Sequence, residues 1–294
     1  MKIAIIGGGA IGLLFANYLS QSHSVTVYTR TEEQAARLNH DGLNFMRNGE
    51  VQTKTIAAKK LAKNVADAQL VIVTVKQYQL SDIYSSIQYC KQPLLFLQNG
   101  YGHIEFLTKL ASPSLFVGVV EHGALKHNSH TVEHTGVGKT KLAVFRGNES
   151  KLPFRHESIE FFPFEVCEDY HSMLLEKLIV NAVINPLTAI LGVPNGELVT
   201  NSAYAKLMDT YFQELASILS IDNPGRTLEH VKAVCRGTSE NRSSMLKDLE
   251  HGRQTEIEAI LGYVLSQAKQ NGQEHRLIDF LYTMIKGKER KEGW

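Results

Sequence analysis

The sequence predicts an α/β protein, in which a parallel sheet covered by helices precedes a second domain made of helices alone. In the first half, short apolar runs alternate with segments of helical spacing, a pattern typical of a parallel sheet buried on both faces. From about Tyr170 the apolar spacing is helical and no comparable strand run follows. A length of 294 residues suits two domains. We therefore predict an α/β domain at 1–168 and an all-helical domain at 169–294.

The apolar runs of the first half are predicted to form the strands of the sheet. They lie at 2–6, 24–28, 70–75, 94–97 and 115–120. Asn48-Gly49 and the segment 136–141 are typical of hairpin turns, and we expect both to add antiparallel strands near the sheet edge.

Segments of helical apolar spacing fill the second half. They lie at 171–190, 203–220, 226–236, 255–270 and 275–287. Proline interrupts the first of them at Pro186, and Pro194 and Pro224 mark further breaks. Because proline disfavours helical geometry in the residue before it, we predict a kink or a helix break at Asn185.

Composition excludes several classes of function. The net charge of +1, without a basic stripe, argues against nucleic acid as a partner. The 3 cysteines are far apart and odd in number, which favours a reducing cytoplasm over a disulfide framework or a cysteine zinc site. The apolar run 3–19 resembles the core of a signal peptide, but its glycines weaken a continuous helix. No other stretch approaches the ~20 apolar residues of a membrane span, so we expect no membrane association.

A loose histidine cluster is the one pattern that suggests a metal. It comprises His122, His127, His130 and His134. His130 and His134 have ligand spacing only if they lie on a helix, and the Ser, Asn and Thr residues around them indicate loop or strand. We therefore predict no metal site.

A glycine motif opens the first predicted helix. Gly7-Gly8-Gly9-Ala10-Ile11-Gly12 has the form G-x-G-x-x-G and directly follows the first strand. In this motif the first glycine makes the turn, the second admits a pyrophosphate and the third allows close packing of helix and strand. The helix N-terminus then offers N–H groups to the phosphates. The motif predicts a Rossmann-like domain that binds a dinucleotide.

The residue after the second strand indicates which dinucleotide binds. An NAD site usually has an acidic residue there, whereas this chain has Arg30, whose guanidinium suits the 2′-phosphate of NADP(H). The alternative is that Arg30 is a surface charge and that Glu32 or Glu33 reaches the ribose. We predict NADP(H).

Two further polar residues follow predicted strands at the edge where open α/β sheets bind ligands. Lys76 is placed to contact the cofactor, and Asn99 to hold the nicotinamide or the substrate. The alternatives are a solvated lysine and an ordinary Asn-Gly turn.

The segment 176–186 carries the strongest catalytic pattern. Lys177, Asn181 and Asn185 are spaced four apart, so they form one polar stripe on an otherwise apolar helix. Partial desolvation would lower the pKa of a lysine there and make it a competent proton donor. A satisfied polar seam between helices explains the stripe equally well. Ser244 and Glu256 add a hydroxyl and a carboxylate, although Glu256 also fits an ordinary position near a helix start.

Taken together, these residues resemble the ketopantoate reductase (2-dehydropantoate 2-reductase) family. The resemblance spans nearly the whole chain, and the lysine–asparagine–asparagine–proline block is its most specific part. The matching stretches are GGGAIG at 7–12, VTVK at 73–76, QNGYG at 98–102, EKLIVNAVINPLTAI at 176–190, PNGEL at 194–198, ENRSSML at 240–246 and TEIEAILG at 255–262.

The resemblance implies a role for each matching residue. Lys177 matches the general acid. Asn99 matches a residue that touches both cofactor and substrate, and Glu256 matches a carboxylate where the two meet. The implied cofactor contacts are Arg30, Lys76 and Ala124, and the implied substrate contacts are Asn99, Asn181, Asn185, Asn195 and Ser244.

The resemblance also implies an activity: cytoplasmic NADPH-dependent reduction of ketopantoate to (R)-pantoate on the route to pantothenate and coenzyme A. It implies a site in the cleft between the domains and a homodimer formed through the helical domain. Two alternatives are a reductase of another branched 2-keto acid and a non-catalytic dinucleotide sensor. A complete set of lysine, asparagines, serine and glutamate argues against the sensor, because a sensor needs no proton donor.

Overall fold

The computed structural model describes residues 1–62, 65 and 67–290, and the chain divides into two compact units. Unit 1 comprises Met1–Gln98 and His103–Leu174. Unit 2 comprises Asn99–Gly102 and the chain from Leu175 onward. The sequence predicts the domain boundary at 168 instead, and it leaves Asn99–Gly102 within the first domain. Part of the reason is Tyr170, whose ring lies 5.3 Å from that of Phe145 and joins the first helical turn to unit 1.

The main sheet of unit 1 has the order β12-β11-β8-β7-β6-β1-β2-β5. Its neighbouring strands are parallel except for the β8–β11 pair, so β11 and β12 run against the others. Five strands match the predicted apolar runs: β1 (Lys2–Ile6), β2 (Ser24–Thr29), β6 (Leu70–Val73), β7 (Leu94–Phe96) and β8 (Leu115–Val120). Strand β11 (Thr140–Arg146) is an antiparallel strand next to the sheet edge, as expected after the turn signal at 136–141. Two strands were not predicted: β5 (Ala57–Lys60) and β12 (Phe164–Val166).

A second sheet, of order β4-β3-β10-β9, corrects both hairpin predictions. A hairpin does turn at Asn48-Gly49, whose φ values of 51° and 82° suit a type I′ turn, but it belongs to this separate sheet. The segment 136–141 is not a hairpin, because the strand before it pairs in the second sheet and the strand after it in the main sheet. The strands are β3 (Leu43–Arg47), β4 (Glu50–Lys54), β9 (Gly123–Lys126) and β10 (Thr131–Gly136).

Helix α1 (Ala10–Leu19) lies between the two sheets and builds the core of unit 1. Its Leu13 and Phe15 are fully buried in one cluster with Ile5 of the main sheet and Val132 of the second sheet. Burying aromatic and branched side chains on both sides of the helix fixes the second sheet over α1. The other helical segments of unit 1 are α2 (Glu32–Asp41), η1 (Gln77–Gln79), α3 (Leu80–Ile87), α4 (Ile104–Thr108) and η2 (Glu149–Lys151).

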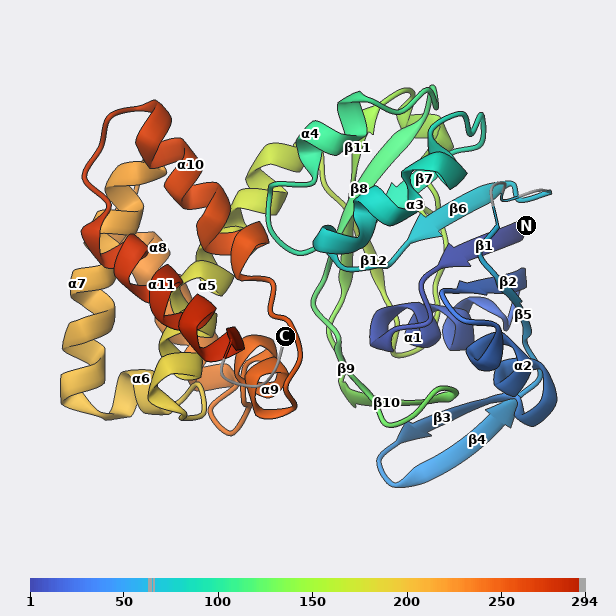
Figure 1. The fold of residues 1–294 in the computed structure, drawn as a ribbon, viewed down its shortest axis with the longest axis horizontal. Helices are drawn as coiled ribbons and strands as arrows, with labels where there is room; N and C mark the ends of the chain where they lie inside the picture. Colours follow the sequence, from blue (N-terminus) through green and yellow to red (C-terminus); the bar gives the residue numbers. More distant parts are fainter. Residues whose placement is uncertain (63–64, 66, 291–294) are drawn as a thin grey trace. The chain divides into compact units, whose positions relative to one another are not determined.

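The described secondary structure of unit 2 consists of helices joined by loops, as the sequence predicts (Figure 1). Five segments correspond to predicted helices: α5 (Tyr170–Leu191), α7 (Ser202–Ile218), α8 (Pro224–Gly237), α10 (Tyr263–Gln270) with the preceding η3 (Glu258–Gly262), and α11 (Arg276–Arg290). Two short helices were not predicted: α6 (Glu197–Thr200) and α9 (Ser244–Glu250). Segment η3 is a single turn of π-helix, a form often found at functional sites.

Helix α5 passes through Pro186 without ending, so of the predicted kink or helix break at Asn185 the break does not occur. Proline has no N–H to donate to the carbonyl four residues earlier, that of Ala182. The Tyr211 hydroxyl of α7 donates to this carbonyl instead, at 2.9 Å and fully buried. A partner from another helix therefore satisfies the group that proline leaves without a donor.

Contrary to the expectation that no other stretch approaches the length of a membrane span, helix α5 is the one helix of the described residues long and apolar enough to cross a membrane. Of its apolar window, 72% is buried inside the protein. Its apolar character is therefore accounted for by packing in the core of unit 2, where Leu178, Val183 and Leu187 are almost completely buried.

Candidate active site

The glycine loop has the geometry that the motif predicts. Gly7 has a φ of +121°, which favours glycine, and a Cβ on Gly12 would lie 1.9 Å from the Gly7 carbonyl oxygen. Gly9 is the N-cap of α1, and a Cβ there would meet no described heavy atom within 4 Å. Ala10 and Ile11 form the first turn of α1, whose N–H groups lack partners within the helix. The loop can therefore receive an anion at a helix N-terminus.

The loop also lies where the order of the main sheet reverses. It follows β1, and the chain places β2 on one side of β1 and β6 on the other. The Thr74 hydroxyl, just after β6, lies 3.1 Å from the carbonyl oxygens of both Ile6 and Gly7. Open α/β sheets bind ligands at this reversal, beyond the carboxyl ends of the strands.

Arg30 directly follows β2 and is exposed to solvent. Glu32 and Glu33, the alternative ribose contacts, occupy the exposed first turn of α2. Acidic residues in that position stabilise the helix N-terminus, so both have a structural explanation. Lys76 is half-buried beyond β6 and is the N-cap of η1, and Ala124 is half-buried in β9.

Lys126 is a cation beside the glycine loop that the sequence did not single out. Its Nζ donates to the Gly8 carbonyl oxygen at 2.8 Å, and Gln34 Nε2 donates to the same oxygen at 2.7 Å. Burial lowers the pKa of Lys126, and the positive charge of Arg30 lowers it further. The nearest residue that the sequence predicts as a cofactor contact is Ala124, which lies two residues away on the same strand.

The structure joins two predicted site residues directly in unit 2. Asn99 Nδ2 donates to Glu256 Oε2 at 2.9 Å, and the Glu256 side chain is buried. Beside them, Gly100 has a φ of +81°, and a Cβ on it would lie 2.2 Å from the Ala259 carbonyl oxygen. The segment Asn99–Gly102 therefore fits closely against the chain around η3.

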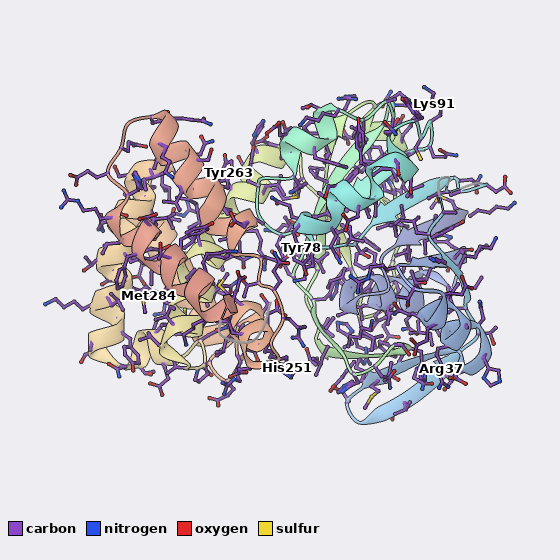
Figure 2. The ribbon with its side chains drawn as sticks, in the orientation of Figure 1. Arg37, Tyr78, Lys91, His251, Tyr263 and Met284 are labelled. Carbon is purple, nitrogen blue, oxygen red and sulfur yellow. The ribbon has the colours of Figure 1, made fainter. Side chains whose placement is uncertain are left out.

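An aromatic pair completes this contact. The rings of Tyr101 and Tyr263 stack with centroids 4.9 Å apart. Figure 2 shows Tyr263 in unit 2, at the start of α10. Asn99, Gly100 and Tyr101 thus contact successive residues in and around η3. These contacts fix Asn99 relative to Glu256.

Glu289 of α11 holds the chain just before Glu256, a role that the sequence did not reveal. Its Oε1 accepts from the backbone N of Thr255 at 2.9 Å and from the Thr255 hydroxyl at 2.6 Å. Burial alone would raise the pKa of Glu289, but hydrogen bonds from Lys286 and Thr255 outweigh burial and lower it. The buried carboxylate is therefore anionic and anchors Thr255 beside the predicted site.

The predicted polar stripe lies on the uninterrupted part of α5. Lys177 is half-buried, whereas Asn181 and Asn185 are 8% and 7% exposed. Because four residues rotate a helix by about 40° beyond one full turn, the three side chains project from neighbouring positions on one face. One side of α5 thus carries an ammonium group next to two amides in an otherwise apolar helix.

Asn195 and Ser244 belong to segments that hydrogen bonds connect to the rest of this region. Asn195 Nδ2 donates to Thr238 Oγ1 at 2.9 Å, and its backbone N donates to the Asn241 carbonyl at 2.9 Å. Ser244 is the exposed first residue of α9. These contacts hold the loop before α6 against the chain that leads into α9.

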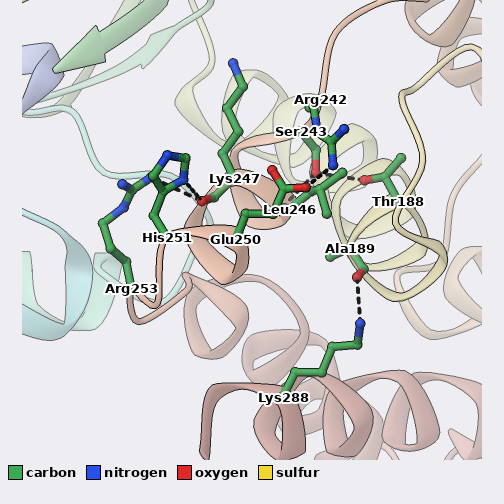
Figure 3. Close-up of polar contacts among 10 residues, drawn as sticks. All are labelled: Thr188, Ala189, Arg242, Ser243, Leu246, Lys247, Glu250, His251, Arg253 and Lys288. Carbon is green, nitrogen blue, oxygen red and sulfur yellow. Dashed lines mark hydrogen bonds and ion pairs between the residues drawn. The ribbon is translucent and has the colours of Figure 1, made fainter. Parts of the chain in front are cut away.

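A buried hydroxyl pair links α5 to the start of α9. Thr188 Oγ1, one turn beyond Ile184 on α5, lies 2.7 Å from Ser243 Oγ, the N-cap of α9 (Figure 3). Ser243 Oγ also accepts from the Leu246 backbone N at 3.2 Å. The bond fixes the helix that carries Asn185 relative to the residue before Ser244.

The histidines do not gather around a metal in the described part of the chain, where no group of three or more potential ligands was found. His134 Nδ1 lies 2.7 Å from the Tyr18 hydroxyl, and the rings of His122 and His134 are 5.2 Å apart. Both imidazoles are buried in the core of unit 1, and the pKa of each is lowered chiefly by burial, that of His122 to about 4.

Comparison with known proteins identifies the family of each half. Residues 3–147 match the model of ketopantoate reductase PanE/ApbA, and residues 169–289 match the model of its C-terminal domain. A relative from Bacillus subtilis (strain 168), named 2-dehydropantoate 2-reductase, is 45% identical over 295 residues, covering 99% of this chain and 98% of the relative. A relative of the same name from Listeria innocua is 37% identical, covering 98% and 97%.

Solved structures agree with this assignment. A crystal structure described as a probable 2-dehydropantoate 2-reductase from Bacillus subtilis has a TM-score of 0.88 at 44% identity, covering 98% of this chain and all of its own. A D-mandelate dehydrogenase with NADH and anilino(oxo)acetate has a TM-score of 0.86, and at 24% identity it shows the shared fold alone. By both family models and by its full-length relatives, the chain belongs to the ketopantoate reductase family.

Proposed function

We propose that this chain reduces 2-dehydropantoate to (R)-pantoate with NADPH, in the cytoplasmic route to pantothenate and coenzyme A. The full-length identity of 45% to a 2-dehydropantoate 2-reductase supports the reaction. The structural observation that carries the proposal is the stripe on α5, where a half-buried lysine adjoins two buried asparagines.

Unit 1 would bind the cofactor. The open space at Gly9 and the N-terminus of α1 suit its pyrophosphate, and Arg30 suits its 2′-phosphate. Lys76 and Ala124 would make further contacts with the cofactor. When bound, the nicotinamide supplies the hydride that forms the new C–H bond at the ketone carbon.

Lys177 would supply the proton. As the C–H bond forms, the electron pair of the carbonyl moves onto oxygen, and the lysine ammonium donates a proton to it to give the hydroxyl group. The same ammonium stabilises the negative charge that develops on this oxygen. The neutral amine is then reprotonated from solvent.

The polar side chains of unit 2 would orient the keto acid. Amides of Asn181, Asn185 and Asn195 and the Ser244 hydroxyl can donate to its carboxylate and exchange hydrogen bonds with its hydroxyl group. Asn99 and Glu256, already joined at 2.9 Å, would act together where cofactor and substrate meet. A substrate held by several donors reacts from one orientation, which lowers the entropic part of the barrier.

The proposal is tested by following NADPH absorbance with and without ketopantoate. We expect oxidation only when the keto acid is present. Replacing Lys177 with alanine should lower kcat by about 10²–10⁴-fold, the usual range for a general acid, because no other residue is proposed to donate the proton. The matched control is Lys206→Ala, an exposed lysine of α7, which should leave kcat unchanged. A Lys177→Ala enzyme with wild-type turnover would remove this lysine from the mechanism.

A further inference from the structure

Two side chains, those of Gln34 and Lys126, donate hydrogen bonds to one backbone oxygen of the glycine loop. The carbonyl oxygen of Gly8 accepts from Gln34 Nε2 at 2.7 Å and from Lys126 Nζ at 2.8 Å. Gln34 Nε2 also lies 2.8 Å from the Ser129 carbonyl oxygen, in the turn between β9 and β10. The second sheet is thus attached to the phosphate-binding loop, and Lys126 is the charged member of this attachment.

Lys126 lies near a second cation, with no carboxylate among the groups that shift its pKa. Burial lowers that pKa, and the other contribution is repulsion from Arg30. A half-buried ammonium group beside a second positive charge costs free energy unless an anion lies near both of them. This arrangement indicates an anion that binds between the end of β2 and the glycine loop.

The position identifies the chemistry of that anion. In Rossmann-like domains the adenosine ribose lies at the end of the second strand, where its 2′ substituent meets the residue that Arg30 occupies here. Side chains alternate along a strand, so Lys126 projects from the same face of β9 as Ala124. An ammonium group has three N–H donors, so Lys126 can keep its bond to Gly8 and donate to a phosphate at the same time.

We propose that Lys126, together with Arg30, binds the 2′-phosphate of the adenosine and so determines the preference of this chain for NADPH over NADH. The inference rests on the proposed function for its cofactor, and it adds a residue from the second sheet to the binding site. The competing explanation is that Lys126 only supports the glycine loop through Gly8. In that case it would affect both cofactors equally.

Fragments of the cofactor separate the two explanations. The purified full chain is titrated calorimetrically with 2′,5′-ADP and with 5′-AMP, which differ only by the 2′-phosphate. We expect Lys126→Met to weaken binding of 2′,5′-ADP by about 10-fold or more, the effect of losing one charge-assisted hydrogen bond, and to leave 5′-AMP binding unchanged. The control is Lys139→Met, a partly exposed lysine of unit 1 that pairs with Glu165 and should change neither affinity.

A second variant guards against loss of fold. Lys126→Gln removes the charge but retains an N–H donor for the Gly8 oxygen, and it should show the same selective loss. Equal weakening of both fragments, or no change in either, would overturn the proposal. So would a wild-type protein that binds both fragments equally.

No keto acid is present in these titrations, so their result is independent of the reduction itself. If the wild-type chain fails to reduce ketopantoate, the proposed function fails while the assignment of Lys126 stands or falls on the titrations.

Discussion

His103 is an imidazole buried in unit 1 without a hydrogen bond. It is 1% exposed, and neither ring nitrogen has a partner among the described residues. A neutral imidazole carries one N–H donor and one acceptor, so both are buried at a cost. Burial lowers the pKa of His103 to about 4. This residue therefore decreases stability, and it does so more strongly as the solution becomes acidic.

Replacing His103 with leucine should stabilise the protein, and the gain should grow at low pH. Because the pKa in the folded state lies below the ordinary value of 6.5, the unfolded chain binds a proton first as pH falls. Wild-type stability should drop by about 2 kcal/mol between about pH 7.5 and about pH 5 from this residue alone. Urea unfolding of both proteins at the two pH values measures it. A pH dependence identical in wild type and variant would contradict the assignment.

Single residues were predictable from the sequence where their role follows from local spacing. The glycines at 7, 9 and 12 and the stripe on α5 depend on neighbours a few positions away. Lys126 was missed because its partner Gly8 is 118 residues distant, and Glu289 because Thr255 is 34 residues distant. Side-chain pairs at such separations carry no signal in one sequence.

At the scale of the element, α5 and α7 share a hydrogen bond that local propensity could not reveal. Pro186 was expected to kink or break its helix at Asn185. It leaves the Ala182 carbonyl without a donor, but Tyr211 supplies one from α7, and the helix continues. An unsatisfied buried carbonyl costs about 1–3 kcal/mol. The continuity of α5 therefore depends on tertiary packing.

Tyr211→Phe should destabilise the protein by about 1–3 kcal/mol, because the Ala182 carbonyl loses its donor. The loss should be smaller in a Pro186→Ala background, where residue 186 regains an N–H for the same carbonyl. A double-mutant cycle in urea measures this coupling. Additive effects of the two substitutions would show that the hydroxyl and the proline are unrelated.

The close fit of the segment Asn99–Gly102 predicts a selective effect of a single methyl group. In Gly100→Ala the new Cβ would meet the Ala259 carbonyl oxygen at 2.2 Å, so the segment and Asn99 must shift. We expect both a lower Tm and a loss in kcat/KM. Gly192→Ala is the matched control, with a φ of +72° but nothing within 4 Å of its Cβ. Gly192→Ala should lower Tm through backbone strain alone and should leave kcat/KM unchanged.

Equal losses of activity in the two alanine variants would mean that the contact with Ala259 is not what positions Asn99. The same measurement separates the clash from the cost of a positive φ, because both glycines have similar positive φ angles.

Elements were predictable where burial imposes a continuous or periodic apolar pattern. The buried strands β1 and β6 and the long helices of unit 2 follow this rule. Strand β4 was indicated only by the Asn48-Gly49 turn, because all its residues are exposed or half-buried and no apolar alternation marks it. Strand β12 has three residues, too few for a periodic pattern.

At the scale of the whole molecule, we propose a homodimer. Apolar side chains of unit 2 that are exposed in the single chain support this prediction: Phe280 is 62% exposed and Leu207 is 42% exposed. Large apolar side chains exposed to solvent often mark contact surfaces.

Light scattering of the purified chain should give a mass near twice 32.8 kDa. Phe280→Lys should shift this mass toward the monomer, since burying a charge at an apolar contact is unfavourable. Lys139→Met, in unit 1, should leave the mass unchanged. A wild-type mass of one chain would refute the dimer.

Substrate choice also belongs to the whole molecule, because the residues assigned to it come from several segments of unit 2. We expect kcat/KM to be highest for ketopantoate in a panel of branched and aromatic 2-keto acids, with NADPH as the reductant. A higher kcat/KM for another keto acid would keep the reaction type and reassign the substrate.

The assignment of Asn99–Gly102 to unit 2 limits how this protein can be divided or recombined. The backbone passes from one unit to the other at three places, and a single cut near Leu174 respects only the last of them. An isolated N-terminal fragment would carry a tetrapeptide without the π-helical surface it fits, and the C-terminal fragment would lack the amide partner of Glu256. A chimaera with a related reductase should therefore exchange these four residues together with the helices, and junctions chosen from sequence order alone should yield inactive hybrids.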